Sequence, residues 1–106
     1  MYIEFARTGG FAGLRLSASV DTQELPSEQV SAVEAMVRDA DFFGLPEKLL
    51  PPAPSPDRFE YRVAISTDKK SHSIVANDAL VPDRLRPLLD YLTTLAMTAK
   101  RGNQLH

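Results

Sequence analysis

Three glycines within residues 9–13 separate two segments in which apolar and polar residues alternate. In the first segment, Ile3 and Phe5 alternate with a charged and a small residue, and residues 14–20 repeat the alternation. A period of two places the apolar side chains on one face of a β-strand, and glycines let the chain reverse within a short connection. The sequence therefore predicts a β-hairpin whose first strand covers about residues 2–7.

Residues 27–40 show a different apolar spacing, of three and four residues, which is typical of an amphipathic helix. The apolar positions are Val30, Val33, Met36, Val37 and Ala40. We expect Ser27 to cap the start of this helix and Gly44 to adopt a left-handed conformation after its end. Pro46 prevents any continuation.

Residues 47–57 contain four prolines, which fix backbone angles and remove amide donors. This segment can be neither a helix nor a central strand, so we expect a stiff surface loop. Beyond it, apolar residues alternate over 59–65 and again over 72–76, and the polar residues 67–70 between them favour a turn. The sequence thus predicts a second hairpin after the proline-rich loop.

The last element is predicted to be a helix with a leucine-rich stripe. Its apolar positions are Leu85, Leu88, Leu89, Leu92, Leu95, Ala96 and Ala99. Pro87 is tolerated in the first turn of a helix or at a kink, so the helix should begin near residues 84–87 or bend there. We expect a single α+β domain over residues 1–101 and a frayed tail at 102–106.

The predicted order of elements is ββαββα, which indicates an α+β two-layer sandwich. The simplest arrangement is a four-stranded antiparallel sheet with both helices on one face. The order of strands across the sheet does not follow from the sequence. The other face of the sheet is predicted to carry Ala6, Ser17, Ser19, Arg62, Ala64 and Ser73.

Composition excludes several classes of protein. Cysteine is absent, so neither a disulfide framework nor a thiolate zinc site is possible. The net charge is −2 with acids and bases interspersed, which argues against a nucleic-acid partner. Residues 1–7 lack the features of a signal peptide, and no apolar stretch reaches membrane-spanning length. We therefore expect a cytoplasmic protein without a membrane partner.

Residues suited to catalysis or metal binding are scarce. His72 is the one histidine inside the predicted fold, and we expect it to be a hydrogen-bonded edge or core residue. Its serine neighbours cannot join it in a triad, because consecutive residues of a strand point to opposite faces. The glycines at 9–13 precede a strand rather than a helix, which excludes a phosphate-binding loop. We predict no enzymatic activity, no metal site and no cofactor.

An ordered set of phrases along the chain resembles the emfourin family. These phrases lie at residues 7–14, 20–22, 25–26, 40–46, 57–61 and 85–92. Members of that family are small inhibitors of protealysin, a thermolysin-like zinc metalloprotease, and are typically encoded beside such a protease without a signal peptide. The resemblance implies that this chain binds in a protease cleft.

The partner-binding residues are expected in two preorganised loops that occlude the substrate cleft. They are Thr8, Gly9, Gly10, Phe11, Ala12, Gly13, Pro54, Ser55, Pro56 and Arg58. Thermolysin-like proteases favour a bulky apolar residue after the cleaved bond, which makes Phe11 a candidate anchor. If Phe11 is buried in the core instead, the proline-rich loop or a sheet edge must make the contact.

A second hypothesis is a non-catalytic interaction or regulatory module that uses the same surfaces on an unrelated protein. Rigid loops on a rigid scaffold suit either role, because they lose little conformational entropy on docking. We expect the protein to be a monomer.

Overall fold

The computed structural model describes residues 1–9, 15–53 and 58–104, with side chains described up to residue 98. Its strands are β1 (Tyr2–Gly9), β2 (Leu16–Asp21), β3 (Lys48–Leu49), β4 (Phe59–Ser66) and β5 (Ser71–Asn77). Its α-helices are α1 (Ser27–Asp39) and α2 (Arg86–Gln104). Single-turn 3-10 helices are η1 (Thr22–Glu24), η2 (Phe42–Gly44), η3 (Asp78–Leu80) and η4 (Asp83–Leu85).

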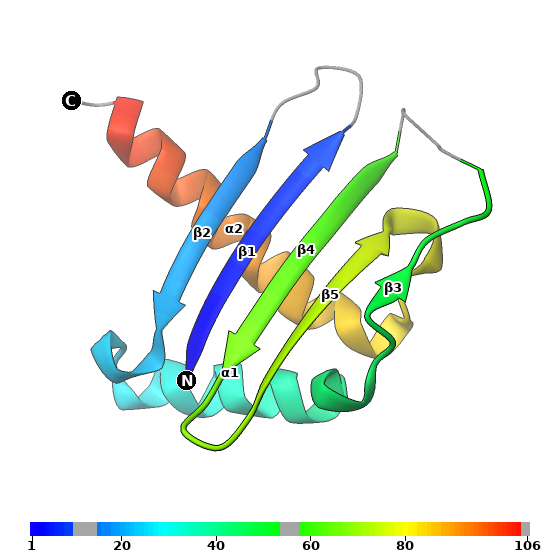
Figure 1. Cartoon of the computed structure of the whole chain (residues 1–106). Coiled ribbons are helices and arrows are strands. Elements are labelled where there is room, and N and C mark those ends of the chain that lie inside the picture. The colour runs from blue at the N-terminus through cyan, green and yellow to red at the C-terminus, as the bar shows by residue number, and fades with distance from the viewer. Residues whose placement is uncertain (10–14, 54–57, 105–106) are drawn as a thin grey trace.

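The strands form one mixed sheet in the order β2-β1-β4-β5-β3, and both α-helices lie on the same side of it (Figure 1). This confirms the predicted α+β two-layer fold with its two hairpins. The four predicted strands pair with one another in antiparallel fashion, whereas β3 runs parallel to β5.

The sheet has five strands in the described residues rather than the four predicted. The additional strand, β3, consists of Lys48 and Leu49, which pair with Val75 and Ala76. Two residues are too few to show an alternating pattern, and β3 lies directly before the prolines. Because β3 is at the edge of the sheet, the prolines that follow it interrupt no central ladder.

The core lies between the sheet and the helices. Alternate residues of the long strands point into it, as do the leucines of α2. Its fully buried members include Ile3, Val33, Val63, Ile65, Leu85, Leu88, Leu89 and Leu92. Burying a side chain of this size contributes about 1.5–3 kcal/mol, so this shared apolar layer supplies the main driving force for folding.

The helix ends differ from the prediction in two details. Ser27 is the first residue of α1, its N-cap is Pro26, and no side chain caps this end. After α1, Asp41 rather than Gly44 adopts the left-handed conformation, with a φ angle of 49°. Asparagine and aspartate are the residues other than glycine that enter this region most readily.

The C-terminal helix begins as predicted. It starts at Arg86 after the 3-10 turn η4, so Pro87 lies in its first turn, where a missing amide breaks no helical hydrogen bond. The helix continues to Gln104, and residues 105–106 lie outside the described part of the chain. The domain limits of 1–101 and 102–106 remain predictions.

Gly9, at the end of β1, lies close to the backbone of Arg58. Its φ angle is +97°, and a Cβ atom at this position would lie 2.5 Å from the carbonyl oxygen of Arg58. Backbone atoms cannot move aside as the end of a side chain can. A residue without a side chain is therefore required at the end of β1.

Replacing Gly9 by Ala should lower the free energy of unfolding by about 2–3 kcal/mol, because a strained φ angle and a backbone clash act together. Gly44→Ala is the matched control. There the nearest atoms to a new Cβ belong to the Asp41 side chain, and φ is not positive. Urea unfolding of both variants tests this, and equal losses of stability would contradict the account.

Candidate functional site

The two loops predicted to bind a partner begin at neighbouring positions in the sheet. Gly9, the last residue of β1, pairs with Phe59, the first residue of β4, and Thr8 pairs with Glu60. Arg58 directly precedes β4. The structure therefore brings together Thr8, Gly9 and Arg58, although they are about fifty positions apart in the sequence. The remaining predicted site residues, at 10–13 and 54–56, lie outside the described residues.

An aromatic contact joins the same two strand ends on the helix side of the sheet. The guanidinium carbon of Arg7 lies 4.1 Å from the centre of the Phe59 ring, which is the geometry of a cation–π interaction. Phe59 in turn lies 6.5 Å, between ring centres, from Tyr61, and Tyr61 is buried. These contacts connect the loop bases to the core.

Asp78 is the centre of a polar cluster beside the start of β4. One carboxylate oxygen accepts a hydrogen bond of 2.8 Å from the Arg86 guanidinium and one of 3.2 Å from the Tyr61 hydroxyl. Arg86 also donates to the backbone carbonyl of Asp78 at 2.7 Å. The other carboxylate oxygen lies 4.0 Å from the guanidinium of Arg58. The cluster therefore connects a predicted loop residue to β4, η3 and the start of α2.

Electrostatics in the cluster favour the charged forms of Asp78 and Arg86. Partial burial alone would raise the pKa of Asp78, but the hydrogen bond and positive charge of Arg86 outweigh burial and hold it below 3.8. The hydrogen bond to Asp78 raises the pKa of Arg86 in turn. Burial first, and then the charge of Asp78, raise the pKa of Tyr61 above 10.0.

Sequence reasoning missed this cluster. Asp78 lies in a turn, where the hydrogen bonds of an aspartate are usually local, but the partners of its carboxylate come from β4 and α2. The local role belongs to Asn77, whose side chain accepts a hydrogen bond from the amide of Ala79. No spacing or motif joins Tyr61, Asp78 and Arg86, so only the tertiary arrangement could reveal them.

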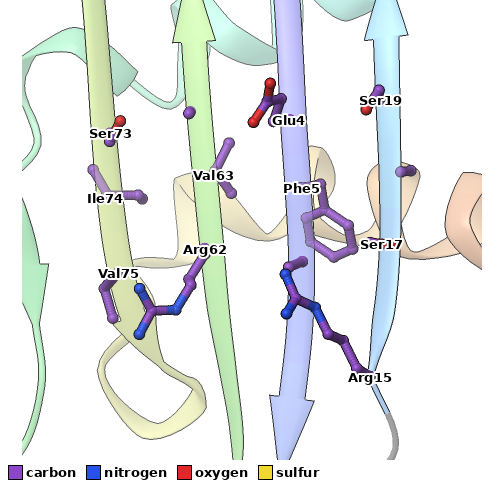
Figure 2. Close-up of a pocket in the computed structure, with 13 residues that line it drawn as sticks. Glu4, Phe5, Arg15, Ser17, Ser19, Arg62, Val63, Ser73, Ile74 and Val75 are labelled. Atoms are coloured by element: carbon purple, nitrogen blue, oxygen red, sulfur yellow. The ribbon is translucent and has the colours of Figure 1, made fainter.

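No helix or strand of the described residues covers the side of the sheet away from the helices, called here the uncovered face. This face is slightly hollowed, and Figure 2 shows the residues that line it. They include all six residues predicted for this face: Ala6, Ser17, Ser19, Arg62, Ala64 and Ser73. Arg15 also reaches onto it from the start of β2. Small side chains at its centre leave the sheet backbone accessible from this side.

His72 has the structural role expected for it. A ring nitrogen, Nε2, lies 2.7 Å from the carbonyl oxygen of Leu45, and the ring packs edge-on against Phe42. Over residues 1–9, 15–53 and 58–104, the structure contains no group of three side chains that could hold a metal ion. Across the same ranges, none of the helices is both long and apolar enough to cross a membrane.

Fold and site together define a small two-layer α+β protein with two loops that start from paired strands at one end of its sheet. The chain belongs to the emfourin family, whose family model matches residues 5–93. Among solved structures, it is similar to emfourin (M4in) from Serratia proteamaculans, an M4 family peptidase inhibitor. The identity is 23%, the match covers 88% of this chain and 86% of the other, and the TM-score is 0.42. Among curated proteins, no significant match exists.

Asp78→Asn should lower the free energy of unfolding by about 1–2 kcal/mol at pH 7, because Arg86 and Tyr61 lose a charged acceptor. Since the pKa of Asp78 is depressed in the fold, this contribution is present above the unfolded value of 3.8 and is lost as pH falls through the lower folded value. The difference between the variant and the parent chain should therefore shrink as the pH falls below 3.8. Asp68→Asn, in the exposed turn after β4, is the control. A constant difference between Asp78→Asn and the parent chain from pH 7 to strongly acidic pH would contradict the assignment.

Proposed function

We propose that this protein inhibits a thermolysin-like zinc metalloprotease of the protealysin type by occluding its substrate cleft. Membership of the emfourin family, whose model matches residues 5–93, supports the proposal. The observation that carries the mechanism is the pairing of Gly9 with Phe59. This pairing makes the bases of two loops, distant in sequence, neighbours at one end of the sheet.

Occlusion requires loops that lose little freedom on binding, because ordering a segment costs free energy. The described residues at both loop bases are well anchored. Gly9 is held against the backbone at Arg58, Arg7 packs on Phe59, and Asp78 reaches Arg58 from the neighbouring η3 turn. The first of these restraints is steric and the second is a cation–π contact. Arg58 is half exposed, so its ion pair with Asp78 contributes least.

In this mechanism, Phe11 anchors the inhibitor in the pocket that receives the apolar residue after the cleaved bond. Binding blocks substrate access, so no chemistry by the inhibitor is needed. Membership of the emfourin family agrees with the prediction that the chain is not an enzyme.

Titration of the purified protein against several thermolysin-like proteases, with a peptide substrate, tests the function. The proposal predicts stoichiometric loss of activity with at least one of them. Absence of inhibition at micromolar excess over every enzyme would overturn it and favour an interaction module with an unrelated partner. Binding of another protein, without loss of activity of any protease, would likewise favour the interaction module over the inhibitor.

Phe11→Ala should raise the inhibition constant by roughly 30-fold or more, since an anchor residue at the centre of an interface is worth about 2 kcal/mol. Tyr2→Ala is the matched control. Tyr2 is an aromatic residue, 41% exposed, at the opposite end of β1. Thermal unfolding must show that both variants remain folded. An unchanged inhibition constant for a folded Phe11→Ala variant would contradict the role of Phe11 as the anchor, but not the inhibitory function itself.

A further inference from the structure

The uncovered face of the sheet has a regular arrangement of charge that the proposed function does not use. Its side chains form four rows of residues that pair across the strands; the first three rows span β2, β1, β4 and β5, and the fourth spans β1, β4 and β5. The first row is Asp21, Tyr2, Ser66 and Ser71; the second is Ser19, Glu4, Ala64 and Ser73. The third row is Ser17, Ala6, Arg62 and Val75; the fourth contains Thr8, Glu60 and Asn77. Arg15, one residue before β2, lies beside the fourth row.

Charge is divided between the two halves of this face. The first two rows carry the carboxylates of Asp21 and Glu4, whereas Arg62 and Arg15 lie in the other half, as Figure 2 shows for Glu4 and the two arginines. Glu60 offsets one of these positive charges, because it lies 3.3 Å from Arg62. Among the described residues, Glu4 forms no ion pair.

We propose that the uncovered face binds the same face of a second copy of this chain, forming a weak two-fold symmetric dimer. A face that is acidic at one end and basic at the other is complementary to itself after a half-turn. A dimer with two-fold symmetry requires a self-complementary surface of this kind, because the same patch of both copies forms the interface.

The register of the dimer follows from the rows. A two-fold axis that crosses the strands between the second and third rows places Glu4 above the partner's Ala6. The partner's Arg62 is then one strand away, at a spacing of about 4.8 Å in the sheet. By symmetry, each dimer contains this contact twice. The same axis brings Asp21 of one copy over the partner's Arg15.

The side chains between these charges suit a close approach of two sheets. Ala6, Ala64, Ser17, Ser19 and Ser73 are small, so they allow a face-to-face separation of about 10 Å. Tyr2, exposed in the first row, would become covered at the rim of the contact. Aromatic residues of this kind are enriched at protein interfaces.

The size of the face sets the strength of the dimer. Four strands and four rows give a footprint on the order of 400 Å² per copy, from the strand spacing and the rise per residue. Stable interfaces bury about 800 Å² per partner. We therefore expect a dimer that dissociates at micromolar concentration. In dilute solution the protein would then be the monomer predicted from the sequence.

In the dimer, the loop-bearing ends of the two copies point in opposite directions, because the axis exchanges the first and fourth rows. The centre of the face and the loop-bearing end are thus different parts of the surface, which meet at Thr8 and Arg15 beside the fourth row. The dimer inference does not depend on the proposed inhibition, and neither test decides the other.

Sedimentation velocity of the full chain from about 5 μM to about 500 μM tests the proposal at the weak affinity expected from the footprint. The parent chain should show a rising dimer fraction. Glu4→Arg or Arg62→Glu should each weaken dimerisation by roughly tenfold or more, since each places like charges together twice per dimer. An equimolar mixture of the two variants should dimerise again, because both contacts then join opposite charges.

Arg38→Glu on α1 is the matched control, since Arg38 is exposed on the helix layer. Thermal unfolding checks that each variant is folded. If Glu4→Arg does not fold, Ser73→Arg replaces it, because it adds a positive charge to the acidic half. A chain that stays monomeric at every concentration would overturn the proposal. So would a dimer that Glu4→Arg and Arg62→Glu leave unchanged, or one that Arg38→Glu weakens equally.

Discussion

The antiparallel pairing of β1 with β4 connects the first strand of the chain to a strand more than fifty residues later. It places β1 in the interior of the sheet, gives both helices a continuous apolar surface, and sets Gly9 against Phe59. Closing a loop of this length has an entropic cost, which the buried layer of Ile3, Val63 and Ile65 must offset. The bases of the two candidate binding loops are neighbours because this pairing forms.

Local patterns were sufficient to predict most elements of this fold. Alternation identified the long strands, and the leucine stripe with Pro87 in its first turn located α2. Local patterns could not predict the features that depend on tertiary contacts. These are the strand order, the two-residue strand β3 and the left-handed conformation of Asp41. Gly44 offered the better local signal for that conformation, but the chain had already turned at Asp41.

The same division applies to the site. Glycines and prolines mark the two loops, because glycine widens the range of backbone angles and proline narrows it. Their spacing in the sequence gave no sign that the bases of the loops are adjacent. The cluster of Tyr61, Asp78 and Arg86 could not be recognised from the sequence, because its members share no helical or strand periodicity. Part of the uncovered face was predictable, since alternation placed Arg62 and its small neighbours on it. The separation of Glu4 and Arg62 into different halves of this face depends on the register of β1 with β4, which the sequence does not show.

The sheet thus has two candidate binding surfaces: the end at which the loops begin, and the face with divided charge. We propose that the protease contacts the loop-bearing end. Cross-saturation NMR of the isotope-labelled chain, bound to an unlabelled and catalytically inactive thermolysin-like protease, tests this claim most directly. We predict saturation transfer concentrated at residues 8–15 and 53–59. Transfer concentrated on α1, on α2 or at the centre of the uncovered face would contradict it.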